Sequence, residues 1–402
     1  MPSRRQLLAG TGFAGIGLIG GHAATADRSG TATLDWPMAR YDAAGTSYNP
    51  DASGPTDDPQ IEWEGELEQT GGFELDPPVV VDETVYAGNE TLVAFDAATG
   101  DVRFSYGNHG GVYRSSPARA SASIYRTETL VITSPDGVVG LNAGGGLCLF
   151  GHRFGDERWQ RPSETAELSV FGPSKTPPPV AVDGTVYSVV PNTSGIVALE
   201  GDNGDERWRT DIEHDSRSGV TLTRPAVRDG TVFATGWPSQ VRAIDAETGD
   251  VLWRDDHDDA TILPPTATEL GVVVPTRSGV TLYGTDGDVR WTRTLDGNMT
   301  DGAAAVADGR VFVINGKTSL HALDLETGDD DWSVPFNHEA TPIVADGIVY
   351  VTNGVELIAF DAETGEQRFT YEAEWYLSPP AIGDGVLYIV DGDRVLALED
   401  RA

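Results

Sequence analysis

Hydrophobic and polar positions follow one repeating pattern along most of this chain. Each copy has a short apolar run, the dipeptide Asp-Gly and a second apolar run, as at residues 178–190 and 342–352. Two apolar runs separated by Asp-Gly predict a β-hairpin, because glycine accepts a positive φ without steric cost. A third apolar run then leads into a turn, such as residues 245–249, and an outer segment with Trp or Phe. In that turn the carboxylate of Asp245 is placed to bond back to the backbone, and Gly249 to take the left-handed conformation. Each copy therefore predicts a four-stranded antiparallel meander.

The number of copies predicts how many such sheets the chain forms. Eight inner hairpins begin near Pro78, Pro117, Pro179, Pro225, Pro265, Ala304, Pro342 and Pro380. Four-stranded units of about 40 residues build a β-propeller, in which each sheet is buried between its neighbours. We therefore predict an all-β fold, an eight-bladed β-propeller of four-stranded antiparallel blades.

The two ends of the chain predict how the ring closes. The eighth hairpin is followed by a third strand near 395–398, and the chain then has no room for an outer strand. Residues 61–63 carry Trp63 with no hairpin before it. An N-terminal strand that completes the last blade would close the ring and remove two exposed sheet edges.

The repeated turn and aromatic together resemble a known family. The pattern Ala-x-Asp-x-x-Thr-Gly-x-x-x-Trp is similar to the tryptophan-docking repeat of the pyrroloquinoline-quinone (PQQ) propellers, from about Trp36 to Leu398. The resemblance implies that the aromatic residues wedge between blades as structural residues. The matching positions are Trp63, Phe104, Trp159, Trp208, Trp253, Trp291, Trp332 and Phe369. The segment 36–50 also resembles the N-terminal lead-in of that family, which contains both quinoprotein alcohol dehydrogenases and a non-catalytic lipoprotein of outer-membrane assembly.

The N-terminus has the features of an export signal. Arg4 and Arg5 precede an apolar run rich in glycine and alanine, and Ala24-Thr25-Ala26 forms an A-x-A cleavage site. This pattern predicts a twin-arginine signal that is cleaved after Ala26. A membrane anchor is the competing interpretation, but the run is shorter than the roughly 20 apolar residues of a membrane span. We expect a signal peptide at 1–26, a lead-in at 27–60 and the propeller at 61–402, with the mature protein extracellular or at the cell surface.

The charge of the chain changes the expected environment. The formal net charge is −36, and self-repulsion of that size opposes compact folding in dilute buffer. Concentrated salt screens the repulsion, so the composition indicates a halophilic protein with an acidic shell. A cation-binding surface is the alternative. A strongly negative surface argues against nucleic-acid binding. Cys148 is the only cysteine, so an intrachain disulfide is excluded.

Candidate binding residues come from loops that open on one face of the expected propeller. These are the loops that join successive blades and the loops between second and third strands. Trp237 and Trp375 lie there, outside the docking positions, and each would either stack on a flat ligand or pack under its own loop. Arg114, Arg277 and Lys317 complete this set of candidate cofactor-binding residues.

The resemblance raises a catalytic alternative. It implies that a quinoprotein dehydrogenase would hold PQQ with a Ca²⁺ bound by carboxylate and amide oxygens, an Asp base and an Arg near the quinone, often under a disulfide of adjacent cysteines. Glu90, Asn192 and Asp301 are available oxygen ligands, but no local motif marks them as a set, and the cysteine pair is missing. We predict no catalytic residue and no metal site.

These observations favour an exported, non-catalytic propeller that binds a protein partner or a small ligand on its loop face. The alternative is a compact PQQ- and Ca-dependent dehydrogenase. The irregular stretches 142–155 and 160–176, both in the second blade, are the expected position of a specialised surface.

Overall fold

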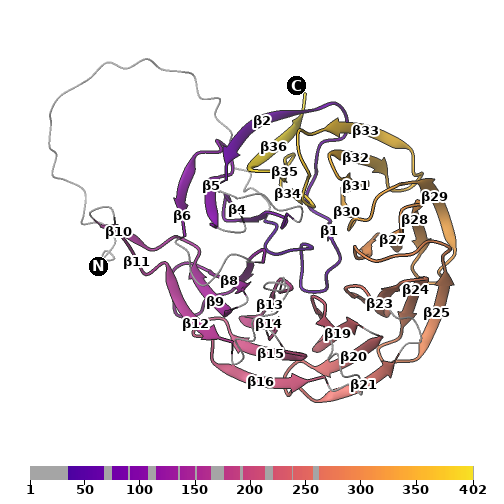
Figure 1. Ribbon diagram of the computed structural model, residues 1–402, viewed down its shortest axis with the longest axis horizontal. Coiled ribbons are helices and arrows are strands. Elements are labelled where there is room, and N and C mark those ends of the chain that lie inside the picture. Colours follow the sequence, from indigo (N-terminus) through magenta and orange to yellow (C-terminus); the bar gives the residue numbers. More distant parts are fainter. Residues whose placement is uncertain are drawn as a thin grey trace, which may run out of the picture. The chain divides into compact units, whose positions relative to one another are not determined.

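The computed structural model describes residues 35–67, 75–88, 91–106, 115–134, 136–149, 152–163, 176–190, 193–212, 221–237, 239–256 and 262–401. They form eight antiparallel sheets arranged in a ring (Figure 1), which confirms the predicted eight-bladed propeller. The export signal lies outside the described residues, so its cleavage site stays a prediction.

Seven blades have their strands in chain order from the centre outward, and in the eighth the outermost strand is β2 from the first part of the chain. The inner strands are β3 (Val79–Val81), β7 (Ala118–Ala120), β13 (Val180–Val182), β18 (Ala226–Arg228), β22 (Thr266–Thr268), β26 (Ala305–Ala307), β30 (Ile343–Ala345) and β34 (Ala381–Ile382). The second strands are β4 (Thr84–Ala87), β8 (Thr129–Ser134), β14 (Thr185–Val189), β19 (Thr231–Trp237), β23 (Gly271–Thr276), β27 (Arg310–Asn315), β31 (Ile348–Asn353) and β35 (Leu387–Asp391).

The outer half of each blade follows the same order. The third strands are β5 (Val93–Asp96), β9 (Gly137–Asn142), β15 (Gly195–Glu200), β20 (Gln240–Asp245), β24 (Gly279–Tyr283), β28 (Ser319–Asp324), β32 (Glu356–Asp361) and β36 (Arg394–Asp400). The outermost strands are β6 (Val102–Ser105), β12 (Glu157–Pro162), β16 (Glu206–Asp211), β21 (Val251–Asp256), β25 (Val289–Thr294), β29 (Asp330–Pro335), β33 (Gln367–Glu372) and β2 (Pro59–Glu66).

Burial explains why the strands differ in composition. Second strands such as β23 are buried along their whole length, because both of their faces pack against neighbouring blades. Outer strands such as β25 alternate exposed and half-buried side chains, since their edge faces water. Continuous apolar runs and alternating runs are the two patterns expected for such positions.

The ring closes as the sequence predicted. Strand β2 pairs antiparallel with β36, with Trp63 opposite Ala397. The first and last parts of the chain thus share the eighth blade (Figure 1), and no sheet edge is left open at this junction.

Tight turns join the inner strands. Asp183-Gly184 and Asp346-Gly347 have positive φ at both residues, which is the geometry of a type I′ turn. Blade one has the same geometry at Asp82 and Glu83 without a glycine.

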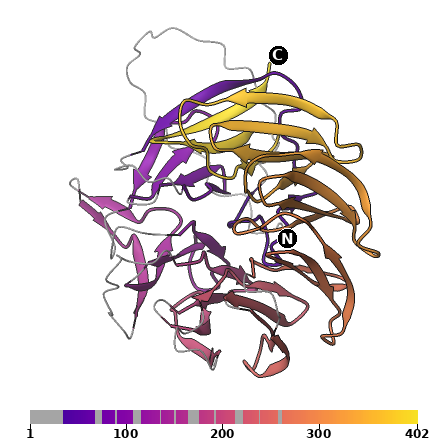
Figure 2. The ribbon, with the colours of Figure 1, turned by 45° about the vertical axis from the view of Figure 1, so that its right-hand side comes forward.

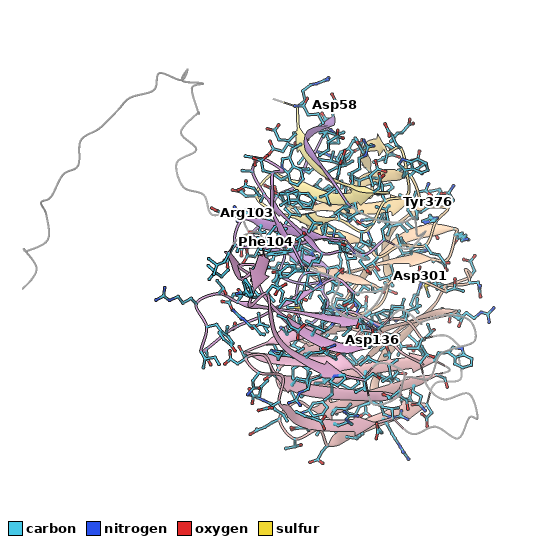
Figure 3. The ribbon with its side chains drawn as sticks, turned by 60° about the vertical axis from the view of Figure 1, so that its left-hand side comes forward. Asp58, Arg103, Phe104, Asp136, Asp301 and Tyr376 are labelled. Carbon is cyan, nitrogen blue, oxygen red and sulfur yellow. The ribbon has the colours of Figure 1, made fainter. Side chains whose placement is uncertain are left out.

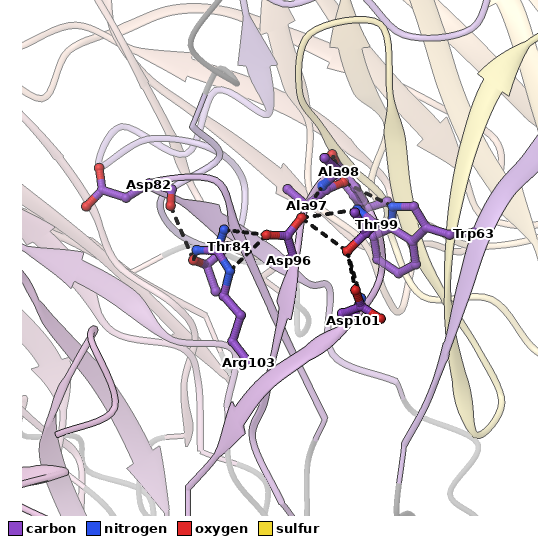
Figure 4. Close-up of polar contacts among 10 residues, drawn as sticks. Trp63, Asp82, Thr84, Asp96, Ala97, Ala98, Thr99, Asp101 and Arg103 are labelled. Atoms are coloured by element: carbon purple, nitrogen blue, oxygen red, sulfur yellow. Dashed lines mark hydrogen bonds and ion pairs between the residues drawn. The ribbon is translucent and has the colours of Figure 1, made fainter. Parts of the chain in front are cut away.

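The outer turns carry the docking aromatics. Asp245 accepts hydrogen bonds from the backbone N–H groups of Glu247 and Thr248, and Gly249 has a φ of 80°. Trp208 of the preceding blade lies on this turn and donates its indole N–H to the carbonyl of Ala246 at 2.9 Å. The same bond recurs around the ring at Trp63, Trp159, Trp253, Trp291 and Trp332. Figure 4 shows it for Trp63 and Ala97. The predicted wedge between blades is confirmed for these six tryptophans.

The lead-in, residues 35–58, runs through the centre of the ring (Figure 1). Its carbonyl groups accept hydrogen bonds of 2.7–2.9 Å from the middle residue of six inner strands: Val80, Arg119, Val227, Ala267, Val306 and Val344. Its short strand β1 (Tyr48–Asn49) pairs parallel with β30. The lead-in thus supplies acceptors to inner sheet edges that would otherwise leave buried N–H groups unpaired.

The second blade contains an extra hairpin. Strands β10 (Leu147–Leu149) and β11 (His152–Phe154) pair with each other within the outer turn, and they project from the ring in Figures 1 and 2. Leu147, Leu149 and Phe154 are exposed on it. The stretch read as irregular in the sequence is therefore partly a β-hairpin. The other such stretch falls mostly outside the described residues. Strand β17 (Thr221–Leu222) is a second addition and pairs with β19 in blade four.

Candidate functional site

A cavity of about 400 Å³ lies where the blade-joining loops meet the lead-in. Proline residues that precede inner strands form part of its wall: Pro77, Pro178, Pro264, Pro379 and Pro380. Proline has a fixed φ and no N–H, so these positions give a stiff wall without unpaired donors. The lead-in contributes Ala39 and Arg40 to the same wall.

Arg40 is a buried cation of this cavity. Its guanidinium donates hydrogen bonds to the carbonyls of Pro265 and Ala304 and to the hydroxyl of Thr266, at 2.6–2.8 Å, and also to the carbonyl of Gly45. Both Arg40 and Tyr41 have φ above 60°. Two successive non-glycine residues in this conformation store backbone strain, which tends to occur at functional positions.

Arg224 is the second buried cation. It lies before β18 and donates to the carbonyls of Asp42 and Pro225. Its Nε atom is buried without a hydrogen-bond partner. A side chain added at Gly45 would lie 3.0 Å from Nη1 of Arg40 and 3.1 Å from Nη1 of Arg224. The two guanidinium groups are therefore close neighbours.

Burial and mutual repulsion act on both groups. Desolvation, followed by the charge of Arg224, lowers the pKa of Arg40 to about 9. Desolvation lowers the pKa of Arg224 to about 10, against the opposing effect of Asp42. Both groups remain protonated at pH 7, so the cavity contains two positive charges.

Most acidic groups of the cavity are more exposed to solvent than the two arginines. Asp301 is exposed, and Glu339 and His338 are half-buried. The Glu339 carboxylate accepts hydrogen bonds from the backbone and hydroxyl of Thr300 at 2.7 Å. Asp76 is a buried acid of the same wall. Figure 3 places Asp301 and Tyr376 on one side of the ring and Arg103 and Phe104 on the other.

The described candidate residues predicted from the sequence, Trp237, Trp375, Arg277 and Lys317, are not part of the cavity wall. Trp237 ends β19 and is 44% exposed, and Trp375 is 60% exposed. Arg277 is exposed and donates to the side chain of Asn298, and Lys317 is exposed in the turn after β27. Arg114 lies outside the described residues. Their role as cofactor ligands stays a prediction.

The sequence analysis named Asp301 among the available oxygen ligands but did not identify Arg40 or Arg224 as residues of the cavity. The position of Arg40 in the lead-in has no repeat, and no local pattern shows that the lead-in passes through the centre. The two consecutive left-handed residues are visible only in the structure.

A site for PQQ and Ca²⁺ would require metal ligands and an aromatic side chain that stacks on the quinone. Within the described ranges, no three His, Cys, Asp or Glu side chains lie close enough to hold a metal ion. The described wall contains no Trp, Tyr or Phe on which a quinone ring would stack. The residues of the described wall therefore do not fit PQQ with Ca²⁺, and we derive no reaction through this cofactor.

No helix long and apolar enough to cross a membrane occurs in the described part of the chain.

Known proteins show the same repeat and the same ring. The family described as "Outer membrane protein assembly factor BamB" matches residues 56–192, 149–354 and 276–401. The protein of that name from Yersinia pestis is 25% identical over 214 residues, which cover 46% of this chain and 54% of the relative. The one from Moranella endobia is 27% identical over 239 residues, covering 52% and 61%. The chain thus spans only about half to three fifths of these relatives.

Solved structures share the fold. BamB from Moraxella catarrhalis has a TM-score of 0.62 at 14% identity, covering 85% of this chain and 99% of that one. The quinohemoprotein alcohol dehydrogenase from Comamonas testosteroni has a TM-score of 0.67 at 15% identity, covering 92% and 81%. At such identities the similarity concerns the propeller alone, which both a binding protein and an enzyme adopt.

Proposed function

Because the chain belongs to the family described as outer membrane protein assembly factor BamB, we propose that it is a non-catalytic binding module. It presents its loop face to a protein partner in the cell envelope or outside the cell. The matched relatives are named for assembly at the outer membrane, and we carry over only the binding role and the envelope location.

The observation that carries this proposal is an exposed aromatic pair beside the cavity. Trp375 is 60% and Tyr376 47% exposed, whereas the following residue, Leu377, is buried and lines the cavity. Exposed Trp and Tyr side chains often provide most of the binding energy at protein interfaces.

The backbone under this pair is held in place. The Trp375 N–H bonds to the Asp391 carboxylate at 2.8 Å, and the Leu377 N–H bonds to the Gly354 carbonyl at 2.7 Å. The rings are therefore presented on fixed backbone, which lowers the entropy lost when a partner binds. Trp237 adds a third exposed ring on the same face.

Affinity capture from the envelope fraction of the source organism tests the proposal. We expect a partner that binds the wild type and is lost with the double variant W375A/Y376A. The matched control is F154A, since Phe154 is 56% exposed but lies on the hairpin of blade two, in an outer turn. A partner retained equally by both variants would contradict the role of the loop face.

We also propose export by the twin-arginine route, on the basis of Arg4, Arg5 and the A-x-A site ending at Ala26. A variant with both arginines changed to lysine should accumulate inside the cell with residues 1–26 attached. N-terminal sequencing of the secreted wild type should begin at Asp27. Equal secretion of the two proteins would exclude this route.

A further inference from the structure

The wall of the central cavity combines features of a ligand site that the partner-binding role does not use. We propose that this cavity binds a small organic carboxylate that has a cationic group at its other end. The carboxylate is received by Arg224 and Arg40, and the cationic group lies toward Asp301 and Glu339.

The first argument is the charge around the two arginines. Their described partners are backbone carbonyls and hydroxyl groups, not carboxylates. Asp42 acts on both charges from nearby, and its oxygens bind the backbone and hydroxyl of Thr46. Among the described residues neither guanidinium is bonded to a carboxylate, although Asp42 and the buried Asp76 lie in the same region. A carboxylate that enters the cavity is therefore placed to bond to the two groups directly.

The second argument is the incomplete hydrogen bonding of Arg224. Its side chain uses two Nη donors, while Nε has no acceptor. Buried donors without a partner are rare in native proteins. A guanidinium binds a carboxylate through two parallel N–H groups, so a modest rotation of Arg224 would satisfy Nε with a ligand oxygen.

The third argument concerns how Arg40 is positioned. Its backbone is left-handed and is followed by a left-handed Tyr41, and its guanidinium donates to five acceptors from three separate segments. Gly45 leaves the space in which the two guanidinium groups approach each other. The fold therefore keeps two like charges together at a cost, which packing of the ring alone does not require.

The acidic side of the cavity sets the ligand class. Asp301 and Glu339 would repel the second carboxylate of a dicarboxylic acid and attract an ammonium group. An amino acid-like compound matches both ends, whereas inorganic phosphate and a polycarboxylate match only one.

Three probes of similar length separate these cases. 4-Aminobutyrate has one carboxylate and one ammonium, glutarate has two carboxylates and putrescine has two ammonium groups. We would titrate each into the mature chain and record the melting temperature and the heat of binding. A ligand that binds only the folded state raises the melting temperature in a saturable manner.

We expect 4-aminobutyrate to bind at least about tenfold more tightly than glutarate or putrescine. R224Q should weaken this binding by at least about tenfold, because it removes the charge that receives the carboxylate. The matched control is R290Q, which changes an exposed arginine of the outermost strand β25 outside the cavity wall, and it should bind like the wild type.

A second variant tests the proposal independently in case R224Q does not fold. A340W places a large side chain in the cavity wall without changing either arginine, so it should block binding while the fold is retained. No saturable shift up to about 50 mM 4-aminobutyrate, or unchanged binding by A340W, would overturn the proposal.

The last probe is PQQ, titrated with and without Ca²⁺ in the same way. A saturable, Ca-dependent shift with PQQ that excludes 4-aminobutyrate would replace the carboxylate assignment with the cofactor alternative. Loss of partner capture by W375A/Y376A is measured independently. Failure of the cavity proposal therefore leaves the proposed binding role of Trp375 and Tyr376 intact.

Discussion

At the scale of single residues, the docking tryptophans carry much of the contact between blades. Trp208 is only 7% exposed, and its ring packs on Gly249 of the next blade while its N–H reaches Ala246. Phe104 lies on the turn of the next blade at Gly145 and has no N–H to donate. Apolar contact is therefore the part of the interaction that Phe104 shares with the docking tryptophans.

W208A should lower the free energy of unfolding by about 3–5 kcal/mol, because it leaves a cavity between two blades. The control W375A removes a ring that is 60% exposed and should change stability by less than about 0.5 kcal/mol. Urea unfolding followed by tryptophan fluorescence measures both. Similar losses for the two variants would contradict the structural role of the docking position.

The turn aspartates link stability to pH. Hydrogen bonds from the backbone of Thr248 and then Glu247 lower the pKa of Asp245 below its usual range, and bonds from Thr327 do the same for Asp324. The folded protein thus favours the ionised carboxylate more than the unfolded chain does. This stabilisation is complete above the unfolded pKa of about 3.9 and is lost as the pH falls through the lower folded pKa.

We expect D245N to be less stable than the wild type at pH 7, with a difference that shrinks as the pH falls below about 4. Denaturant midpoints measured at several pH values give this difference. E247Q is the matched control, because it removes a charge from the same turn but keeps the Asp245 acceptor. A D245N difference that stays constant with pH would show that Asp245 is not responsible.

At the scale of elements, the two kinds of turn use glycine differently. Gly230, in the inner hairpin of blade four, has a φ of 76° and open space where a side chain would lie. Gly249, in the outer turn of that blade, has a φ of 80°, and a side chain would approach the Trp208 ring to 2.8 Å. The first position therefore needs glycine for its backbone alone, and the second also for the close approach of the ring.

These two positions provide a matched pair. G230A should cost about 1–2 kcal/mol, the usual penalty of a left-handed non-glycine residue. G249A should cost clearly more, because the added methyl also displaces Trp208 from its turn. Thermal unfolding of the two variants compares them directly. Equal losses would mean that the docking contact tolerates an extra methyl group.

The lead-in is the element for which the sequence analysis predicted least of the observed structure. Its resemblance to the lead-in of PQQ propellers was recognised, but its path was not. Only the folded ring shows that its carbonyls serve six inner strands in turn and bring Arg40 next to Arg224, which is 184 residues later.

At the scale of the whole molecule, the net charge of −36 leads us to propose a halophilic protein. The Debye length falls from about 10 Å at 0.1 M salt to about 3 Å at 1 M, so repulsion across the acidic surface is screened at high salt. We expect the melting temperature to rise steeply over this range of KCl. Sucrose is the control, since it favours compact states without screening charge. A melting temperature independent of KCl would rule out a salt-dependent fold.

The repeating unit, and through it the ring of blades, was predictable from the sequence alone. Asp-Gly hairpins and turn aspartates make their bonds within a few residues of chain, and the docking aromatics recur at a regular offset from these turns. Counting them predicted eight blades, and the unmatched Trp63 predicted the closing strand that pairs with β36.

The position of the cavity and the charges that face it depend on how the blades close into a ring. Arg40, Arg224 and Asp301 come from the lead-in and from two distant blade-joining loops, and the closed ring brings them together. No spacing in the sequence predicts that these three residues lie together. Each loop follows its own blade, and the lead-in has no repeat. The predicted candidates Trp237, Trp375, Arg277 and Lys317 are absent from the cavity wall, because the wall is formed by residues that meet only when the ring closes.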